Sequence, residues 1–298
     1  MQARKGGLVQ RRRRAGAAAL ILTAAAVVLA AFVMMFVASR HGAQVSTDHG
    51  PGHVHALAVN PSDDALFVAS HTGLYRVGRG ESSARRVSDR SQDTMGFAVV
   101  GADRFLGSGH PDLRDNLPSR LGLIESRDGG KSWTPVSLLG DADFHVLRAR
   151  GARIVGYDAA SGQVFTSRDG GKHWRRHRFE GPLLDLVIAP APLQTLLATS
   201  PAQLLLSRDG GRSWGSLSET TGLLAWPKPE RLYLLASDGR LWLSPDVGRR
   251  WRALGQIGGR PAALAAYGDG RIYAALHSGI IKESTDGGRS WRPLARAG

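Results

Sequence analysis

The stretch Ser126-Arg-Asp128-Gly-Gly130-Lys-Ser-Trp133 decides the fold, because related stretches begin at Ser167, Ser207, Ser244 and Ser284. A period near 40 residues indicates a propeller or another repeat array. Five of the seven tryptophans stand at the same place in the copies, which argues for true repetition. The shared positions are Asp128, Gly130 and Trp133; Asp169, Gly171 and Trp174; Asp209, Gly211 and Trp214; Asp246, Gly248 and Trp251; and Asp286, Gly288 and Trp291.

The residue types of the repeated stretch are those of a tight turn. An aspartate side chain accepts backbone N–H groups within a turn, and glycine adopts positive φ at little steric cost. A tryptophan then packs a large apolar surface on the neighbouring sheet. We therefore expect each copy to join the two outer strands of one blade and to serve structure only.

Short apolar runs precede each copy and complete a four-strand unit. The first unit has such runs at residues 55–59, 65–69 and 73–77, followed by a degenerate copy at 78–82 and a fourth run at 84–87. Six units of this kind predict an all-β, six-bladed β-propeller over residues 53–298. No strand is left over to lock the ring, so we expect blade-on-blade packing to close it.

The N-terminal region predicts a membrane anchor. Residues 1–16 are basic, and residues 17–38 carry no charge, which as a helix is long enough to cross a bilayer. The basic flank predicts a cytoplasmic N-terminus, so the propeller lies outside, in a periplasmic or extracellular space. Residues 39–52 form a polar linker, and Val37-Ala38-Ser39 leaves the alternative of a cleaved signal peptide open.

Composition excludes several classes of function. The chain has no cysteine, so disulfides, thiolate ligands and thiol nucleophiles are absent. The net charge is +14, but seven basic residues and no acidic residue fall within residues 1–40. The remaining excess is spread along the chain without a basic stripe or a base-stacking motif, so we expect no nucleic-acid partner.

Aligning the units brings polar residues to one end of the predicted channel. One position of the first strands reads His55, Met95, His145, Asp185, Leu224 and Ala262, and the second strands end near His71, His110, Asp158 and His277. In an antiparallel blade these two strand ends share a face, opposite the repeated turns. The predicted metal ligands at this mouth are His53, His55, His71, Met95, His110, His145, Asp185 and His277.

Two interpretations of this mouth stay open. Polar residues can simply line a wet channel, or they can hold a transition metal. Imidazoles suit zinc, copper, iron and nickel, and a thioether favours copper, so copper or zinc is the expected cofactor. The pair His53-Val-His55 would present both imidazoles on one side of a strand, because side chains alternate with a period of two.

The repeated stretch resembles the Asp box, or BNR repeat, of sialidases, sortilin-like receptors and photosystem assembly factors. Residues 53–59, 69–74, 95–97, 108–112 and 143–147 further resemble a family of small exported bacterial propellers catalogued as sialidase-like glycosyl hydrolases. This likeness covers about residues 50–298. It implies a glycan or an envelope protein as alternative partners to a metal ion.

Catalysis by a glycosidase requires two suitably placed carboxyl groups. Asp158 and Asp185 are the weak candidates, and histidines stand where a sialidase would place its substrate-binding arginines. The favoured hypothesis is therefore a non-enzymatic, membrane-anchored propeller that binds metal. The alternatives are a glycoside hydrolase and a scaffold for the assembly of membrane-protein complexes.

Overall fold

A computed structural model describes residues 53–296, which all belong to the compact unit Asp48–Gly298. The predicted basic segment 1–16, anchor helix 17–38 and linker 39–52 lie outside the described residues. Within the described residues no helix is long and apolar enough to cross a membrane.

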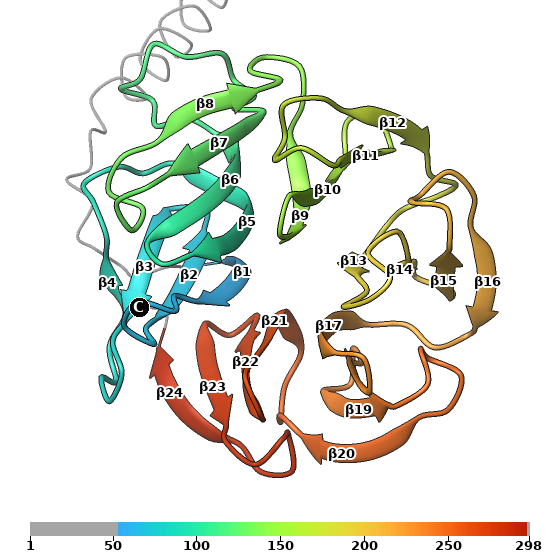
Figure 1. Ribbon diagram of the computed structural model, residues 1–298. Coiled ribbons are helices and arrows are strands. Elements are labelled where there is room, and N and C mark those ends of the chain that lie inside the picture. Colours follow the sequence, from blue (N-terminus) through green and yellow to red (C-terminus); the bar gives the residue numbers. More distant parts are fainter. Residues whose placement is uncertain (1–52, 297–298) are drawn as a thin grey trace, which may run out of the picture. The chain divides into compact units, whose positions relative to one another are not determined.

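Twenty-four strands form six antiparallel four-stranded sheets, each built from consecutive strands. The predicted all-β, six-bladed propeller is confirmed, and Figure 1 shows the sheets arranged in a ring with the first strand of each innermost. The strands of blades one to three are β1 (Val54–Val59), β2 (Leu66–Ser70), β3 (Gly73–Val77), β4 (Arg85–Arg86), β5 (Asp93–Gly101), β6 (Arg104–His110), β7 (Leu123–Ser126), β8 (Thr134–Ser137), β9 (Phe144–Arg150), β10 (Arg153–Asp158), β11 (Gln163–Ser167) and β12 (Arg175–Arg178). Those of blades four to six are β13 (Asp185–Ile188), β14 (Leu196–Thr199), β15 (Leu204–Ser207), β16 (Gly215–Ser218), β17 (Leu223–Lys228), β18 (Arg231–Leu235), β19 (Arg240–Ser244), β20 (Arg252–Gln256), β21 (Pro261–Tyr267), β22 (Arg271–Leu276), β23 (Ile280–Ser284) and β24 (Arg292–Arg296).

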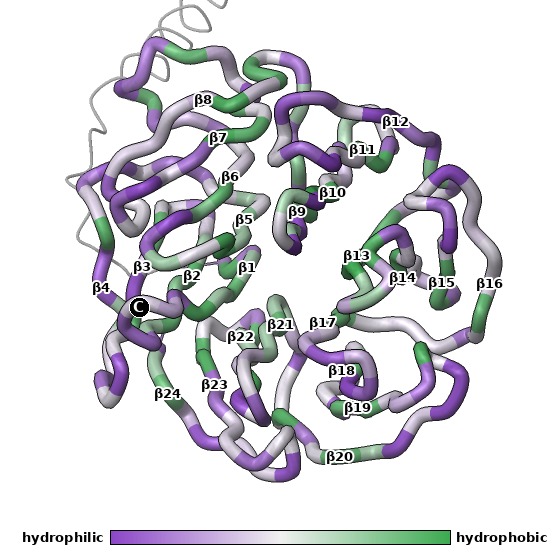
Figure 2. Tube along the Cα trace, viewed as in Figure 1, coloured by the Kyte–Doolittle hydropathy of each residue, from purple (hydrophilic) through white to green (hydrophobic). Residues whose placement is uncertain are grey.

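The hydrophobic core is divided into six clusters, one between each pair of neighbouring blades. Inner and middle strands supply these side chains, and Figure 2 shows hydrophobic β13 near the centre and hydrophilic β12 at the rim. Each repeat tryptophan joins the cluster between its own blade and the preceding one; Trp133, for example, packs with Phe67 and Phe105. The repeated stretch thus stabilises the contact between blades as well as its own turn.

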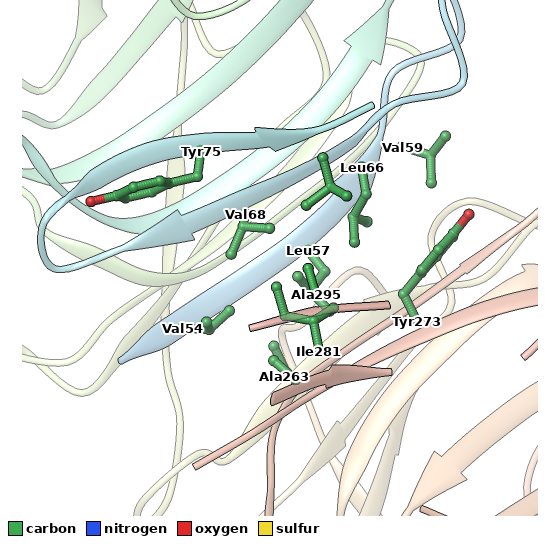
Figure 3. Packing of buried hydrophobic residues seen from close by; sticks show 12 residues of the cluster. Val54, Leu57, Val59, Leu66, Val68, Tyr75, Ala263, Tyr273, Ile281 and Ala295 are labelled. Carbon is green, nitrogen blue, oxygen red and sulfur yellow. The ribbon is translucent and has the colours of Figure 1, made fainter. Parts of the chain in front are cut away.

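The ring closes without a tryptophan, because blade one lacks the repeated stretch. Figure 3 shows the closing cluster, in which Val54, Leu57 and Val68 of blade one meet Ala263 and Ile281 of blade six. Blade one and blade six are each complete from consecutive strands. Closure therefore comes from packing of one blade on the next, together with a parallel bridge between Ser83 and Arg296 and an ion pair between Asp64 and Arg271.

The five repeated stretches form turns between the third and fourth strands of blades two to six, and we call them the repeat turns. In the first, Asp128 Oδ1 accepts the backbone N–H groups of Lys131 and Ser132 at 3.1 and 3.0 Å. Ser126 Oγ accepts the N–H of Gly130 at 2.8 Å. The side chains thus satisfy backbone donors that the tight turn leaves without a ladder partner.

Replacing Asp128 with alanine should destabilise the propeller. The substitution leaves two backbone donors without their acceptor and removes the bond from Ser132 Oγ, at 2.6 Å from Asp128 Oδ2. Because the turn is exposed and water replaces part of this bonding, we expect a loss of about 1–2 kcal/mol in the free energy of unfolding. Urea unfolding followed by tryptophan fluorescence measures it, and a midpoint equal to wild type would contradict the assigned role.

Candidate functional site

The first strands of all six blades line a central channel with a cavity of about 470 Å³. The residues aligned in the sequence all reach it: His55, Met95, His145, Asp185, Leu224 and Ala262. The polar members belong to blades one to four, whereas blades five and six contribute apolar side chains. At this position the channel wall is therefore polar along blades one to four and apolar along blades five and six.

The aligned position is a β-bulge in four blades. Strand register shifts between Val54 and Ala56, between Thr94 and Gly96, and likewise around His145 and Ala262. A bulge turns a side chain away from the regular alternation of a strand and is frequent beside functional sites. His53 and His55 do lie together, with ring centroids 5.0 Å apart, but His53 precedes β1 and His55 occupies the bulge. Simple alternation is thus not the reason for their proximity.

His55, His71 and Asp93 form the centre of the site. One potential ligand atom from each lies within 4.8 Å of the others. Asp93 Oδ1 is 3.4 Å from His55 Nε2 and 3.0 Å from His71 Nδ1. Two imidazoles and a carboxylate converging on one point are a donor set suited to a divalent transition metal.

The approach of His55 Nε2 to Asp93 Oδ1 is not a hydrogen bond. His55 Nε2 and Asp93 Oδ1 are both buried, and neither has a partner in hydrogen-bond geometry among residues 53–296. Their separation fits an ion-pair contact, but their alignment does not satisfy either atom. Buried polar atoms are rarely left unsatisfied, so these two atoms are candidates to bind a further group.

A chain of alternating carboxylates and imidazoles extends from the centre into blade three. Asp93 Oδ2 lies 3.3 Å from His110 Nδ1, and His110 Nε2 lies 3.4 Å from Asp143 Oδ2. The same Asp143 oxygen is 3.0 Å from His145 Nε2. Contacts of this kind hold a metal-binding carboxylate in a fixed orientation.

Electrostatics keep the central carboxylate ionised. Burial by itself raises the pKa of Asp93, but contacts with His55 and His71 outweigh it and hold the pKa at about 2. The bond to Asp143 raises the pKa of His145 above its ordinary value. Burial, and then the neighbouring His55, lowers the pKa of His53 and keeps that ring neutral. The site therefore offers the anionic oxygens of Asp93 beside the neutral ring of His53 near pH 7.

The backbone beside the site requires a glycine at position 109. Gly109 has φ +135°, and a Cβ there would lie 2.0 Å from the carbonyl oxygen of Asp93. Any other residue would push β5 and β6 apart and separate Asp93 from His110. Gly109 is thus a structural condition for the chain of contacts.

The insertion of blade two is fastened near the same mouth. Asp112 is buried and accepts the backbone N–H of Ser91 at 2.7 Å and bonds from Arg114. These contacts tie the connection between β6 and β7 to the segment that enters β5, and the bonds to Arg114 keep the pKa of Asp112 well below its usual range. Leu113 beside them is fully exposed.

The other predicted ligands lie at different distances from the centre. His53 stacks near His71 and His277, with ring centroids 5.4 and 5.3 Å apart. Met95 lines a cavity of about 400 Å³ at the mouth, together with His53, His55, His71 and His145. No lysine or arginine of the described chain lines that cavity.

Asp185 and Asp158 are engaged elsewhere. Asp185 forms an ion pair with Arg148 at 2.6 Å and accepts the backbone N–H of Leu224 at 2.8 Å. Asp158 is buried and accepts the N–H groups of Asp143 and Ser161 at 3.0 and 3.1 Å. The Asp185 oxygens join blade four to blades three and five, whereas the Asp158 oxygens bond within blade three. Asp185 lines the channel with His55 and His145, but its ion pair within the described residues is with Arg148.

Asp93 and Asp143 are the site residues that the sequence alignment missed. Each stands two residues before an aligned position, as His53 does before His55. The same alignment displaced by two would have found them, since it reads His53, Asp93, Asp143 and Leu183 in blades one to four. The aligned position itself holds His55, Met95 and His145, so it does not point to the carboxylates two residues earlier.

Comparison by sequence finds no matching family model and no matching curated protein. Comparison of structures finds YCF48 from Cyanidioschyzon merolae, with TM-score 0.51, 15% identity and coverage of 82% of this chain and 85% of that one. YCF48 bound to D1 peptide gives TM-score 0.53 and 18% identity, with 82% of each chain covered. A nidogen/laminin complex chain gives TM-score 0.61 at 13% identity, covering 78% and 93%.

An ancestral GH74 enzyme is also similar, with TM-score 0.53 and 15% identity over 80% of this chain. This chain spans only 37% of that enzyme, so the likeness extends to part of a larger protein. Likeness at such identities establishes the fold alone. The chain is a six-bladed β-propeller, similar in fold to YCF48 and to part of an ancestral GH74 enzyme.

Proposed function

We propose that this protein is a metal-binding propeller of the cell envelope, with a transition-metal site at the channel mouth. The observation that carries the proposal is the convergence of His55, His71 and Asp93 with two of their facing atoms left unsatisfied. A metal ion between these atoms would supply the partner that both lack. Asp93 and Asp143 would supply the negative charge that attracts it.

The number of ligands favours a site that exchanges its ion. Three protein ligands leave at least one position of a tetrahedral zinc or copper ion open to water or to another ligand. Met95 lines the mouth cavity and offers a thioether in the vicinity, which favours copper over zinc. An open site at the mouth suits capture and transfer of an ion better than a permanent structural role.

The anchor belongs to the same proposal. Residues 17–38 would hold the protein in the membrane, with the propeller in the periplasmic or extracellular space. There the mouth would meet metal ions before they enter the cell. Binding of an envelope protein stays a prediction.

The proposal does not extend to glycoside hydrolysis. Asp158 and Asp185, the two candidate acids, accept backbone N–H bonds, and Asp185 is also paired with Arg148. A general acid needs access to the glycosidic oxygen. Both carboxylates are buried and already bonded within the protein, so neither has that access.

Metal titration of the full-length chain in detergent tests the proposal. After chelation, Zn²⁺ and Cu²⁺ should each bind at one site and raise the melting temperature, because an ion that binds the folded state stabilises it. The double substitution His55→Ala and His71→Ala should abolish this effect.

His173→Ser is the matched control, because serine already occupies the equivalent position in three other repeat turns. It removes an exposed histidine away from the mouth and should leave metal binding unchanged. Absence of a metal-dependent shift in the wild type, or an equal shift in the double variant, would refute the proposal.

A further inference from the structure

A second cavity, of about 290 Å³, lies between blades three and four at the opposite end of the strands. Arg153 marks this end of β10, because it pairs with Arg150 at the turn between β9 and β10, whereas Asp158 ends the strand near the mouth. The repeat turns of blades three and four form part of the wall through Asp169, Asp209 and Gly210. This cavity is therefore separate from the histidine site.

Arg153 is the unusual residue of this cavity. Its side chain is buried, with 6% of the residue exposed. Its Nε and Nη2 atoms have no hydrogen-bond partner anywhere in residues 53–296. A buried guanidinium without a counter-charge is strongly unfavourable, so the fold retains a cost that a bound anion would remove.

The residues around Arg153 add further positive charge to the cavity, with few negative charges to neutralise it. Arg168, Arg175 and Arg212 line the same cavity, and none of them forms an ion pair with a carboxylate of the described chain. Burial, and then the charge of Arg168, lowers the pKa of Arg153. Burial and Arg212 likewise lower the pKa of His177, which also lines the cavity.

The two carboxylates in the wall are already occupied by their own turns. Asp169 Oδ1 accepts the N–H groups of Lys172 and His173 at 3.1 and 3.0 Å. Asp209 Oδ1 accepts the N–H of Arg212 at 3.0 Å. Neither forms an ion pair with Arg153, so they leave the guanidinium of Arg153 free to meet a ligand.

We propose that this cavity binds a tetrahedral oxyanion, either free phosphate or the phosphate group of a small metabolite. A guanidinium presents several N–H donors in a plane and bonds two oxygens of a phosphate at once. The cavity lies at the low end of the size range of ligand pockets, which favours a small ligand. Because Arg153 is buried, a flat polyanionic surface cannot reach it.

Inorganic phosphate added to the full-length chain in detergent tests the proposal. Phosphate at constant ionic strength should raise the melting temperature, and calorimetry should give one saturable site. Arg153→Met should weaken binding by about 10- to 100-fold, the usual consequence of losing a charged hydrogen-bond donor. The same variant should melt no lower than wild type without phosphate, because its buried charge is gone.

A matched pair keeps the test decisive if Arg153→Met fails to fold. Arg175→Ala removes a cavity arginine and should weaken phosphate binding. Arg176→Ala removes its neighbour, which lies over the Phe165 ring at 4.8 Å and does not line the cavity, and should bind phosphate as wild type does.

Two further ligands distinguish the sources of the phosphate group. Binding of glycerol 3-phosphate with equal or higher affinity would support a small metabolite, and weaker binding would support free phosphate. Binding only to vesicles of phosphatidylglycerol, with no response to phosphate, would overturn the proposal. So would phosphate binding that is unaffected by both Arg153→Met and Arg175→Ala.

Discussion

Asp93→Asn should reduce the affinity for Zn²⁺ or Cu²⁺ by at least about 100-fold, because the substitution removes both a ligand oxygen and the central negative charge. Asp93 contacts His55 and His71 through one oxygen and His110 through the other. No other carboxylate of the described chain has this position. Competition with a chromogenic chelator, using the full-length chain, measures the loss.

Asp141→Asn is the control for charge alone. Asp141 is exposed, and its side chain forms no ion pair within residues 53–296. The substitution Asp141→Asn removes the same formal charge from the segment that leads into β9 but should leave metal affinity unchanged. If Asp93→Asn and Asp141→Asn bind metal equally well, Asp93 is not a ligand and the site is misplaced.

Metal affinity should fall steeply on acidification. Histidine binds a metal only when neutral, and imidazole ordinarily titrates near pH 6.5, so two ligand imidazoles cost up to about 100-fold in affinity per pH unit below that range. Because the pKa of His145 is raised, its ring becomes positively charged near the site at a higher pH than an ordinary imidazole does. The decline should therefore begin above pH 6.5.

In the metal-free protein, the stability contributed by the pair of His145 and Asp143 should depend on pH in the opposite direction from metal affinity. Because the folded pKa of His145 is raised by Asp143, the pair stabilises the fold fully below the unfolded pKa of histidine. That contribution is lost as pH rises through the raised folded value. Melting curves with and without metal across pH 5 to 8 separate the two effects, and an affinity independent of pH would exclude histidine ligands.

The sequence predicted the architecture because the repeat leaves little freedom. Trp133 and its counterparts recur at a fixed place, and each proved to pack between two blades. The alignment of first strands also placed His55, Met95 and His145 in one channel. Such positions follow from the repeat alone, since every blade has the same topology.

The details of the site depend on features without a repeated pattern. The bulge at His55 and the close approach at Gly109 are backbone irregularities, and only coordinates reveal them. Asp185 is equivalent to the histidines in the alignment, yet it forms an ion pair with Arg148 of the neighbouring blade. The buried, unpaired state of Arg153 likewise results from packing between blades that no single repeat encodes.

Anomalous diffraction from crystals of the full-length protein, recorded at the absorption edge of zinc or copper, tests the central claim most directly. The proposed site predicts one strong peak at roughly 2.0–2.2 Å from His55 Nε2, His71 Nδ1 and an oxygen of Asp93. A peak bound to other residues, or a mouth without an anomalous peak in metal-soaked crystals, would contradict it.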